Sequence, residues 1–519
     1  MSFKPLKTAK AITIFGDKIL YTGTTAGAKK IAKLHNGKIV DLGGKVVVPG
    51  FIDSHMHLDS LGIGLNTLDV TNARSIKEIK EKLRKFADTH SDANWLRGRG
   101  WDQEFFAEGR WPNRRDIDEI VANKPVLLIR VCGHIAVVNT KALELLKGLS
   151  IPLEPPFYDR DKSGELTGLL REDGVKCVRG LIKYESDELV KFFEDACNHA
   201  LSYGVTTVAI AGCDSEVLNA LQLMLLNHKL PLRIRAFIRP ELLPHAKNLG
   251  IKQGFGNPYL KISGVKMLAD GSFGGRTALL SKPYADDPST SGVPTITDEE
   301  LKRIVKEASE NKLQVATHAI GDKAIDMVLD AYESCSRYIP ELKHRIEHTS
   351  IIRPDQVSRI AKLGVVTAVQ PHFIIADWWV VKRVGAKRAS WVYPFKTLLD
   401  AKVQMGFSTD CPVEPINPWE TVYASVTRGK YEKIELFRYT KNETLDTATT
   451  IHLYTEGSAR ILHEEDALGT LEEGKFADLV VVDRDPIKTK PKELREIKVL
   501  GTIVGGALVY ASKELKSTF

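Results

Sequence analysis

Short runs of β-branched and other apolar residues alternate with longer segments of helical periodicity through most of the chain. The apolar runs lie at residues 47–57, 204–212, 233–240, 262–271, 313–322, 343–350, 364–372 and 404–413. Between them, as at 298–310 and 355–363, apolar positions recur every three or four residues, which is the period of an amphipathic helix. Eight strands that alternate with helices predict a parallel sheet closed into a (β/α)₈ TIM barrel, since right-handed crossovers place each strand beside the last.

The two ends of the chain show short strands punctuated by glycine. Near the N-terminus the predicted strands are residues 11–15, 18–21, 38–41 and 46–48, and we expect no sustained helix there. Residues 477–482 and 499–509 repeat this pattern near the C-terminus. Because neither end holds enough strands for an independent domain, we expect residues 1–49 and 456–519 to form one composite β-sandwich domain.

The connection after the first barrel strand is much longer than an ordinary βα loop. It covers residues 70–185 and contains predicted strands and helices of its own, with Trp, Gly and Arg concentrated in RGRGWDQEFF and EGRWPNRRD. We therefore expect an inserted subdomain within a barrel domain of residues 50–455. Since the insertion follows the C-terminal end of a barrel strand, it is predicted to lie near the active-site mouth as a lid or substrate wall.

Composition narrows the class of protein. The chain has 519 residues, 43% hydrophobic and 27% charged, which suits a folded protein of two or three structural units. The net charge of +7 is dispersed among many acids, which argues against a nucleic-acid partner. The six cysteines form no C-x-x-C pair, and neither a signal peptide nor a membrane span is evident. We expect a cytoplasmic protein without a membrane partner, and whether it forms a homo-oligomer stays open.

The strongest local signal for chemistry is an H-x-H pair that ends the first predicted barrel strand, in VVVPGFIDSHMH. Side chains alternate along a strand, so His55 and His57 face the same side and can bind one metal ion. His318, His348 and Asp410 stand at the ends of later strands, and the C-terminal strand ends of a barrel converge on one mouth. Any one of them could instead be a structural polar residue that caps a helix. Together they predict a metal centre.

Lys266 lies in the apolar run ISGVKMLADG of the fourth predicted strand. Burial disfavours the ammonium form and lowers the pKa of a lysine. A neutral amine can react with carbon dioxide to give a carbamate, which is able to bridge two cations. The alternative interpretation is an ammonium that pairs with Asp270 or with an acidic substrate.

Nine ordered segments of the chain resemble the amidohydrolase superfamily, and specifically its YtcJ-like branch (amidohydrolase family 3), whose best-known activity is hydrolysis of N-substituted formamides. The segments are VVPGFIDSHMHL, GWDQ with EGRWPNRRDID, CGHIAVVNTKAL, LTGLLRE, VKMLADGSFGGRTA, THAIGD, RIEHTS, FSTDCPVEPINPW and LGTLEEGKFADLVVVDRDP. The resemblance covers nearly the whole chain. It implies a distorted (β/α)₈ barrel with a composite β domain.

The resemblance also implies a binuclear metal centre. One divalent ion would be held by His55, His57 and Asp410, and the other by His318 and His348. A carboxylated Lys266 would bridge the two ions. Mixed imidazole and carboxylate ligands favour zinc.

These residues predict a metal-dependent hydrolase that acts on a carbon–nitrogen bond other than a peptide bond, in an amide or N-substituted formamide of a small molecule. A hydroxide shared by two cations would attack the carbonyl, and Asp410 would carry the proton from this water to the departing amine. One alternative is hydrolysis of an ester, lactone or cyclic imide at the same site. Another is a regulatory barrel that binds metal without turnover, although the retained Asp410 weighs against it.

Six further residues are candidates for substrate binding. His372 ends the seventh predicted strand and His134 lies in CGHIAVVN, and either could donate a hydrogen bond to substrate. The remaining candidates are Trp101, Asp102, Glu172 and Arg276. For each of them a structural role is the alternative, and for Arg276 this is an ion pair with Asp270. Asp322 is expected to be a helix N-cap.

Overall fold

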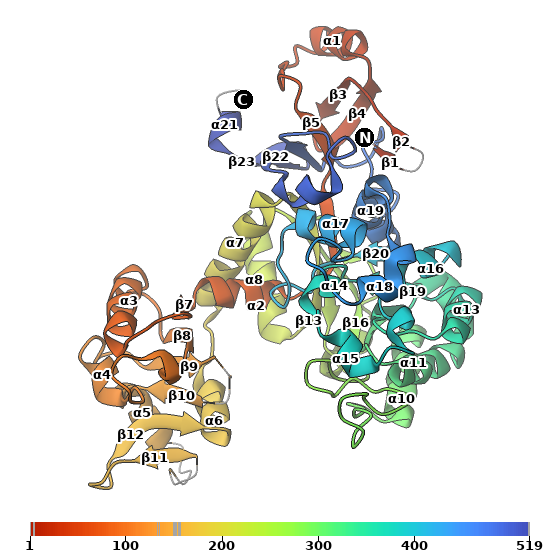
Figure 1. The fold of residues 1–519 in the computed structure, drawn as a ribbon. Helices are drawn as coiled ribbons and strands as arrows, with labels where there is room; N and C mark the ends of the chain where they lie inside the picture. The colour runs from red at the N-terminus through yellow and green to blue at the C-terminus, as the bar shows by residue number, and fades with distance from the viewer. Residues whose placement is uncertain are drawn as a thin grey trace. The chain divides into compact units, whose positions relative to one another are not determined.

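The computed structural model describes residues 2–3, 6–131, 133, 135–148, 153 and 157–516. The chain divides into two compact units, one of Met1–Leu61 with Phe193–Phe519 and one of Gly62–Phe192. The first unit contains a barrel and strands from both ends of the chain, and the second contains the long insertion (Figure 1). None of the helices in these described ranges is both long and apolar enough to cross a membrane.

Eight parallel strands form the barrel of the first unit. In chain order they are β6 (Phe51–Met56), β13 (Val205–Cys213), β14 (Arg233–Ile238), β16 (Leu260–Leu268), β17 (Gln314–Ala319), β18 (Arg345–His348), β19 (Val366–Val369) and β20 (Met405–Phe407). They are ordered β20-β19-β18-β17-β16-β14-β13-β6 in the sheet. No ladder joins β20 to β6 among these strands, but Ser54 Oγ donates to Phe407 O at 2.9 Å and nearly closes the barrel. The predicted (β/α)₈ barrel is confirmed.

The barrel strands are buried on both faces because helices cover the outside. Helix α10 (Asp298–Glu310) begins after an N-cap in which the Thr297 side chain accepts from Glu300 N, and three acids occupy its first turn. It buries Leu301, Ile304, Val305 and Ala308, which lie along one stripe. Helix α13 (Pro354–Leu363) ends at Gly364, whose φ of 74° is the left-handed conformation of a helix C-cap. Both predicted helices are confirmed.

Strands from the two ends of the chain share one sheet. Its antiparallel order is β23 (Ala507–Ala511), β22 (Val499–Val504), β21 (Leu479–Val482) and β5 (Val46–Pro49). The N-terminal hairpin of β3 (Ala11–Phe15) and β4 (Lys18–Gly23) forms a separate two-stranded sheet. Because β5 pairs with β21, the chain enters the barrel directly from a sheet that its own C-terminal region completes.

Three expectations for the chain ends are wrong in detail. Residues 25–34 form a helix, α1 (Thr25–Leu34), because Ala, Lys and Leu are strong helix formers and Thr24 caps the first turn. Residues 38–41 are not a strand. The apolar run 47–57 is two strands in two sheets, divided at Gly50. A Cβ at Gly50 would lie 2.1 Å from Thr206 Oγ1, so only glycine lets the chain pass between the sheets there.

The second unit is built on a six-stranded mixed sheet. Its order is β11 (Tyr158–Arg160), β12 (Leu166–Arg171), β10 (Ile135–Val138), β9 (Val126–Arg130), β8 (Leu96–Trp101) and β7 (Leu68–Asp69). Successive residues of β9 enter different cores, since Val126 and Leu128 pack in one cluster and Leu127 in another. The insertion therefore has a hydrophobic core on each face of its own sheet.

Two buried ion pairs secure the start of β14, at the end of the barrel where its strands begin. Arg233 Nε lies 2.7 Å from Asp478 Oδ2, just before β21, and Arg235 Nε lies 2.8 Å from Glu464 Oε1. Both guanidinium groups are fully buried, so each carboxylate compensates a charge that water cannot reach. This end of the barrel is held by charges that are paired within the fold.

Candidate metal centre

The six predicted ligands come together where the barrel strands end. His55 Nε2 lies 3.4 Å from Asp410 Oδ1 and 3.5 Å from Lys266 Nζ. His57 Nε2 lies 3.2 Å from the same Asp410 oxygen. The ring of His348 has its centroid 4.9 Å from that of His55 and 4.5 Å from that of His318. Residues more than 350 positions apart in the sequence thus share one site.

The fold explains this convergence. Lys266 and His318 lie near the ends of the neighbouring strands β16 and β17, and His348 is the last residue of β18. Asp410 follows β20 by three residues, and its amide donates to His55 O at 2.9 Å, which ties it to β6. Parallel strands end at a common rim, so these side chains converge without a long loop.

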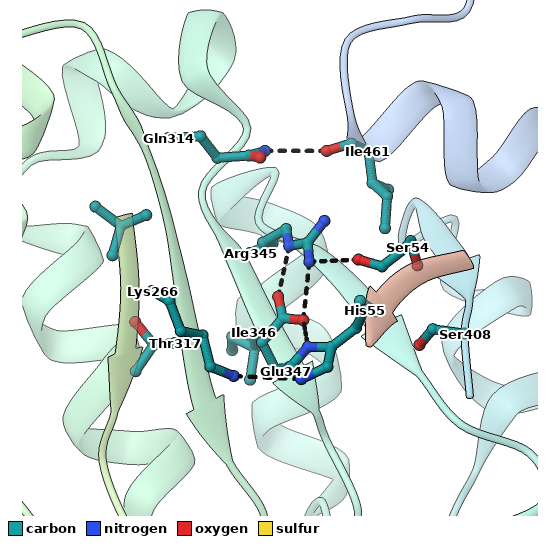
Figure 2. Close-up of polar contacts among 12 residues, drawn as sticks. Ser54, His55, Lys266, Gln314, Thr317, Arg345, Ile346, Glu347, Ser408 and Ile461 are labelled. Atoms are coloured by element: carbon teal, nitrogen blue, oxygen red, sulfur yellow. Dashed lines mark hydrogen bonds and ion pairs between the residues drawn. The ribbon is translucent and has the colours of Figure 1, made fainter. Parts of the chain in front are cut away.

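The ring of His55 is held by a buried ion pair (Figure 2). Its Nδ1 contacts Glu347 Oε2. Arg345 Nε and Nη2 donate to the two oxygens of Glu347 at 2.5 and 2.9 Å. With Nδ1 used in this contact, Nε2 is the nitrogen that faces Asp410 and Lys266.

The rings of His318 and His348 are held mainly by a backbone carbonyl and by a side-chain amide. His318 Nε2 donates to Gly271 O at 2.9 Å, with Asp270 Oδ1 at 3.3 Å. His348 Nδ1 lies 2.8 Å from Gln370 Oε1, and the Gln370 amide donates to Ser408 Oγ at 2.9 Å. In each case one ring nitrogen is bonded within the protein and the other is left for the centre.

The electrostatics of the site suit metal binding. Burial lowers the pKa of His55, and the charge of Lys266 lowers it further. Burial also takes the pKa of His348 well below its usual range. Both imidazoles are therefore neutral and have a free electron pair at neutral pH. Burial lowers the pKa of Lys266 to about 8, so an appreciable fraction of its amine is unprotonated near pH 7 to 8.

Asp410 provides the anionic ligand. Burial alone would raise its pKa, but the neighbouring His55 and His57 rings outweigh that effect and keep the pKa well below the usual range. Oδ1 of Asp410 is buried and receives no hydrogen bond of normal geometry from the described residues. Ligand atoms of His55, His348 and Asp410 all lie within 4.8 Å of one another. A buried carboxylate oxygen that faces imidazole nitrogens is the donor set of a zinc site, so these residues fit a divalent metal.

Backbone strain accompanies the centre. His348, Thr349 and Asp410 have φ values of 71°, 47° and 61°, in the left-handed region that residues other than glycine seldom occupy. Such conformations persist where the surrounding structure fixes them, and they cluster at functional sites.

The other candidates on this unit have identifiable partners. His372 Nδ1 contacts Glu414 Oε2, and both side chains are largely buried. The expected ion pair between Arg276 and Asp270 is wrong, because Arg276 pairs with Asp286 at 3.0 Å. Both oxygens of Asp270 instead accept backbone amides, from Leu279, Ile320 and Gly321. Lys266 Nζ lies instead beside His55 Nε2, at 3.5 Å, and has no ion pair with Asp270 among the described residues.

The remaining candidates lie in the insertion unit. Trp101 is fully buried in a core cluster, and its indole N–H donates to Leu128 O at 2.8 Å. Asp102 pairs with Arg130 at 2.7 Å. Glu172 has a φ of 44° and immediately precedes helix α6 (Asp173–Leu181). His134 lies outside the described residues.

Three residues at or near the site were not predicted as functional, and one role was wrong. Glu347, Gln370 and Glu414 contact the histidines, and the charge of Glu347 inside the apolar strand RIEH was the signal that could have found it.

Asp322 is not the N-cap of α11 (Asp322–Glu333), since that position is Gly321. Asp322 instead accepts hydrogen bonds from Ser281.

Comparison with known proteins gives a consistent result. The model of the amidohydrolase family matches residues 38–510. The chain is 32% identical to YtcJ of Bacillus subtilis (strain 168), over 91% of this chain and 90% of that protein. It is 26% identical to the N-substituted formamide deformylase of Arthrobacter pascens, over 97% and 95%.

A solved structure is also similar. The crystal structure of an uncharacterized metal-dependent hydrolase from Pyrococcus horikoshii OT3 superposes with a TM-score of 0.83 at 42% sequence identity, covering 95% of this chain and 97% of the other. Together with the cluster of candidate metal ligands at the rim of the barrel, these matches show that the chain belongs to the amidohydrolase family of metal-dependent hydrolases.

Proposed function

We propose that this protein hydrolyses a carbon–nitrogen bond, in an amide or N-substituted formamide of a small molecule. The observation that supports this most directly is the buried Oδ1 of Asp410, which faces ring nitrogens of His55 and His57 and lies close to His348 without a hydrogen bond from a described residue. The similarity to the N-substituted formamide deformylase of Arthrobacter pascens supports the choice of bond.

Two divalent ions, zinc by the nature of the donors, are proposed for the centre. His55, His57 and Asp410 would hold one and His318 and His348 the other. When bound, the ions supply Lewis acidity that polarises the substrate carbonyl and makes water nucleophilic at neutral pH. Lys266 would join them as a carbamate, formed when its neutral amine bonds to the carbon of carbon dioxide and releases one proton to solvent.

Asp410 is proposed as the group that moves the proton. An amide nitrogen is a poor leaving group unless it is protonated as the C–N bond breaks. Oδ1 of Asp410 would take the proton that the attacking water loses and deliver it to the departing nitrogen. With Asp410 only 7% exposed, bulk water cannot readily compete for this proton.

His372 is proposed to orient the substrate. It lies two residues beyond Gln370, which holds His348, and its Nδ1 is fixed by Glu414. The Nε2 atom of the ring is then available to hydrogen-bond a substrate oxygen. Glu414 would keep the ring in one orientation during the reaction.

The test is hydrolysis by protein loaded with zinc, compared with the same protein after chelation. The panel contains N-substituted formamides, other amides, esters, lactones and a cyclic imide. We expect zinc-dependent turnover of the amide or formamide substrates and almost none by Asp410→Asn. Turnover confined to esters, lactones or imides would refute the choice of bond. If the zinc-loaded protein hydrolysed no member of the panel, the proposal that it is a hydrolase would be refuted. Intact mass spectrometry of the native protein would show whether Lys266 has gained carbon dioxide.

A further inference from the structure

The four histidines of the centre are held in different ways. His55 contacts the carboxylate of Glu347, which is itself paired with Arg345. His348 is held by the neutral amide of Gln370. The ring of His57 has no such carboxylate behind it among the described residues and is 33% exposed. His318 Nε2 donates to Gly271 O and lies 3.3 Å from Asp270 Oδ1, a carboxylate that backbone amides hold. Direct contact with a carboxylate that is paired with a buried arginine is therefore particular to His55 among these four rings.

Glu347 has to be the acceptor in its contact with His55. Its carboxylate receives two hydrogen bonds from the guanidinium of Arg345, at 2.5 and 2.9 Å, which hold it as an anion. An anionic carboxylate has no hydrogen to donate, so Nδ1 of His55 carries the hydrogen. The electron pair of the ring then lies on Nε2, toward Asp410 and Lys266.

Arg345 fixes this arrangement across the interior of the barrel. Its Nη2 also donates to Ser54 O at 2.7 Å, on the residue next to His55 (Figure 2). Strands β18 and β6 are not neighbours in the sheet, so these contacts join two separate parts of the barrel wall. The guanidinium lies 4.4 Å from the ring centroid of Phe237, which leaves it little freedom to move. Carboxylate, arginine and the β6 backbone thus form one rigid support.

We infer that Glu347 is a positioning residue for the metal, which fixes the tautomer of His55 through a support built by Arg345 and makes Nε2 a stronger ligand. This inference rests on the proposed metal centre. A carboxylate behind a histidine ligand orients the ring and raises its basicity, and loss of such a group typically costs about 10–100-fold in metal affinity.

The decisive variant is Glu347→Gln, which keeps the shape of the side chain and removes its charge. Zinc affinity is measured by competition with a chromophoric chelator, and thermal unfolding is measured on the metal-free protein. The matched control is Glu464→Gln, since Glu464 is a buried carboxylate paired with Arg235 at the end of the barrel where the strands begin, away from the candidate ligands. We expect Glu347→Gln to bind zinc about 10–100-fold more weakly, and Glu464→Gln to bind it like the unaltered protein.

A purely structural role predicts a different pattern. It would lower the melting temperature of both metal-free variants and leave their zinc affinities alike. The visible spectrum of the cobalt-loaded protein adds a second readout, because a rotated or differently protonated His55 changes the ligand field in Glu347→Gln but not in Glu464→Gln.

If Glu347→Gln fails to fold because Arg345 is left uncompensated, the double variant Arg345→Met with Glu347→Gln removes both charges. We expect it to fold and to retain the weakened zinc affinity. Zinc affinity equal to that of the unaltered protein in either variant would overturn the inference. Since affinity and turnover are measured separately, tight zinc binding without hydrolysis would refute the proposed function and leave this inference intact.

Discussion

His344, just before β18, and His348, at its end, show what separates a structural imidazole from a candidate metal ligand. His344 stands just before the strand, where its Nδ1 accepts from Val315 N at 3.0 Å and its Nε2 lies 2.8 Å from Ser309 Oγ. His348 ends the strand, and only its Nδ1 has a hydrogen-bond partner within the described part of the chain. Both rings are buried, so burial does not distinguish them. The candidate ligand, His348, is the ring with one nitrogen left without a hydrogen bond from the described residues.

The same contrast holds between the two ends of the barrel. Where the strands begin, Arg233 and Arg235 have buried carboxylate partners. Where the strands end, Asp410 has a buried oxygen without a hydrogen bond from any described residue. Leaving such an oxygen unpaired costs about 1–3 kcal/mol. The charges of Arg233 and Arg235 are therefore neutralised within the fold, whereas the Asp410 oxygen faces imidazole nitrogens and is placed to meet a cation.

Removal of the Asp410 charge, at the end of the barrel where the strands end, should cause the largest loss of turnover. In Asp410→Asn the amide can neither accept the proton of the attacking water nor bind a cation as an anion. We expect turnover at saturating zinc to fall by about 10²–10⁴-fold. Steady-state kinetics checks this, with Asp355→Asn on the surface of α13 as the control. Turnover within a few-fold of the unaltered protein would remove Asp410 from the proton transfer.

Lys266→Met tests whether the second metal position needs the lysine. Methionine fills similar volume in the apolar strand but cannot form a carbamate. We expect the zinc content, measured by atomic emission after gel filtration, to fall from two ions per chain to one, with a loss of most turnover. A short carboxylic acid such as propionate should restore part of the activity by occupying the space of the carbamate. Two tightly bound ions in this variant would contradict a bridging role.

Substitution of His344 and of His348 should separate the stability of the fold from its affinity for zinc. We expect His348→Gln to weaken zinc binding and to change the stability of the metal-free protein little. His344→Gln should leave zinc binding intact and cost about 1–3 kcal/mol of unfolding free energy, because buried partners lose their hydrogen bonds. Urea unfolding and zinc competition, run on both variants, check this. The contrast between the two residues fails if their effects are the same.

The sequence locates the candidate ligands better than it locates the residues that hold them. His55, His57, Lys266, His318, His348 and Asp410 all lie on or directly after apolar strands, and the geometry of a barrel then brings them together. The charge of Glu347 inside an apolar strand marks it as unusual, but the strand pattern assigns no partner to it or to Gln370. Their roles depend on which side chain each meets across the barrel, and that depends on strand register rather than on any local pattern.

Local errors have a similar origin. Arg276 was expected to pair with the nearby Asp270, but loop amides already satisfy both oxygens of that carboxylate. Helix α1 was missed because the glycine at position 27 suggests a turn, whereas the Thr24 cap and the surrounding alanines and lysines favour a helix. The partner of a side chain and the conformation of a short segment both depend on which of several interactions is strongest. A sequence pattern along one segment does not show which interaction that is.

The smallest expected effect is the dependence of stability on pH that His344 produces. Burial lowers the pKa of His344 to about 3, from an ordinary value near 6.5. Between these values the unfolded chain binds a proton that the folded protein excludes, so stability rises with pH and levels off above about 6.5. By pH 5.5 this group alone should cost about 1.4 kcal/mol relative to pH 8.

Urea unfolding of the chelated protein at a series of pH values checks this contribution, since chelation removes any effect of metal release. His344→Gln should show a shallower loss of stability below pH 6.5 than the unaltered protein, by about 1.4 kcal/mol at pH 5.5. Parallel pH profiles for the two proteins would mean that His344 is protonated in the fold. Its hydrogen bond from Val315 N could not then exist, because a protonated Nδ1 has no electron pair to accept it.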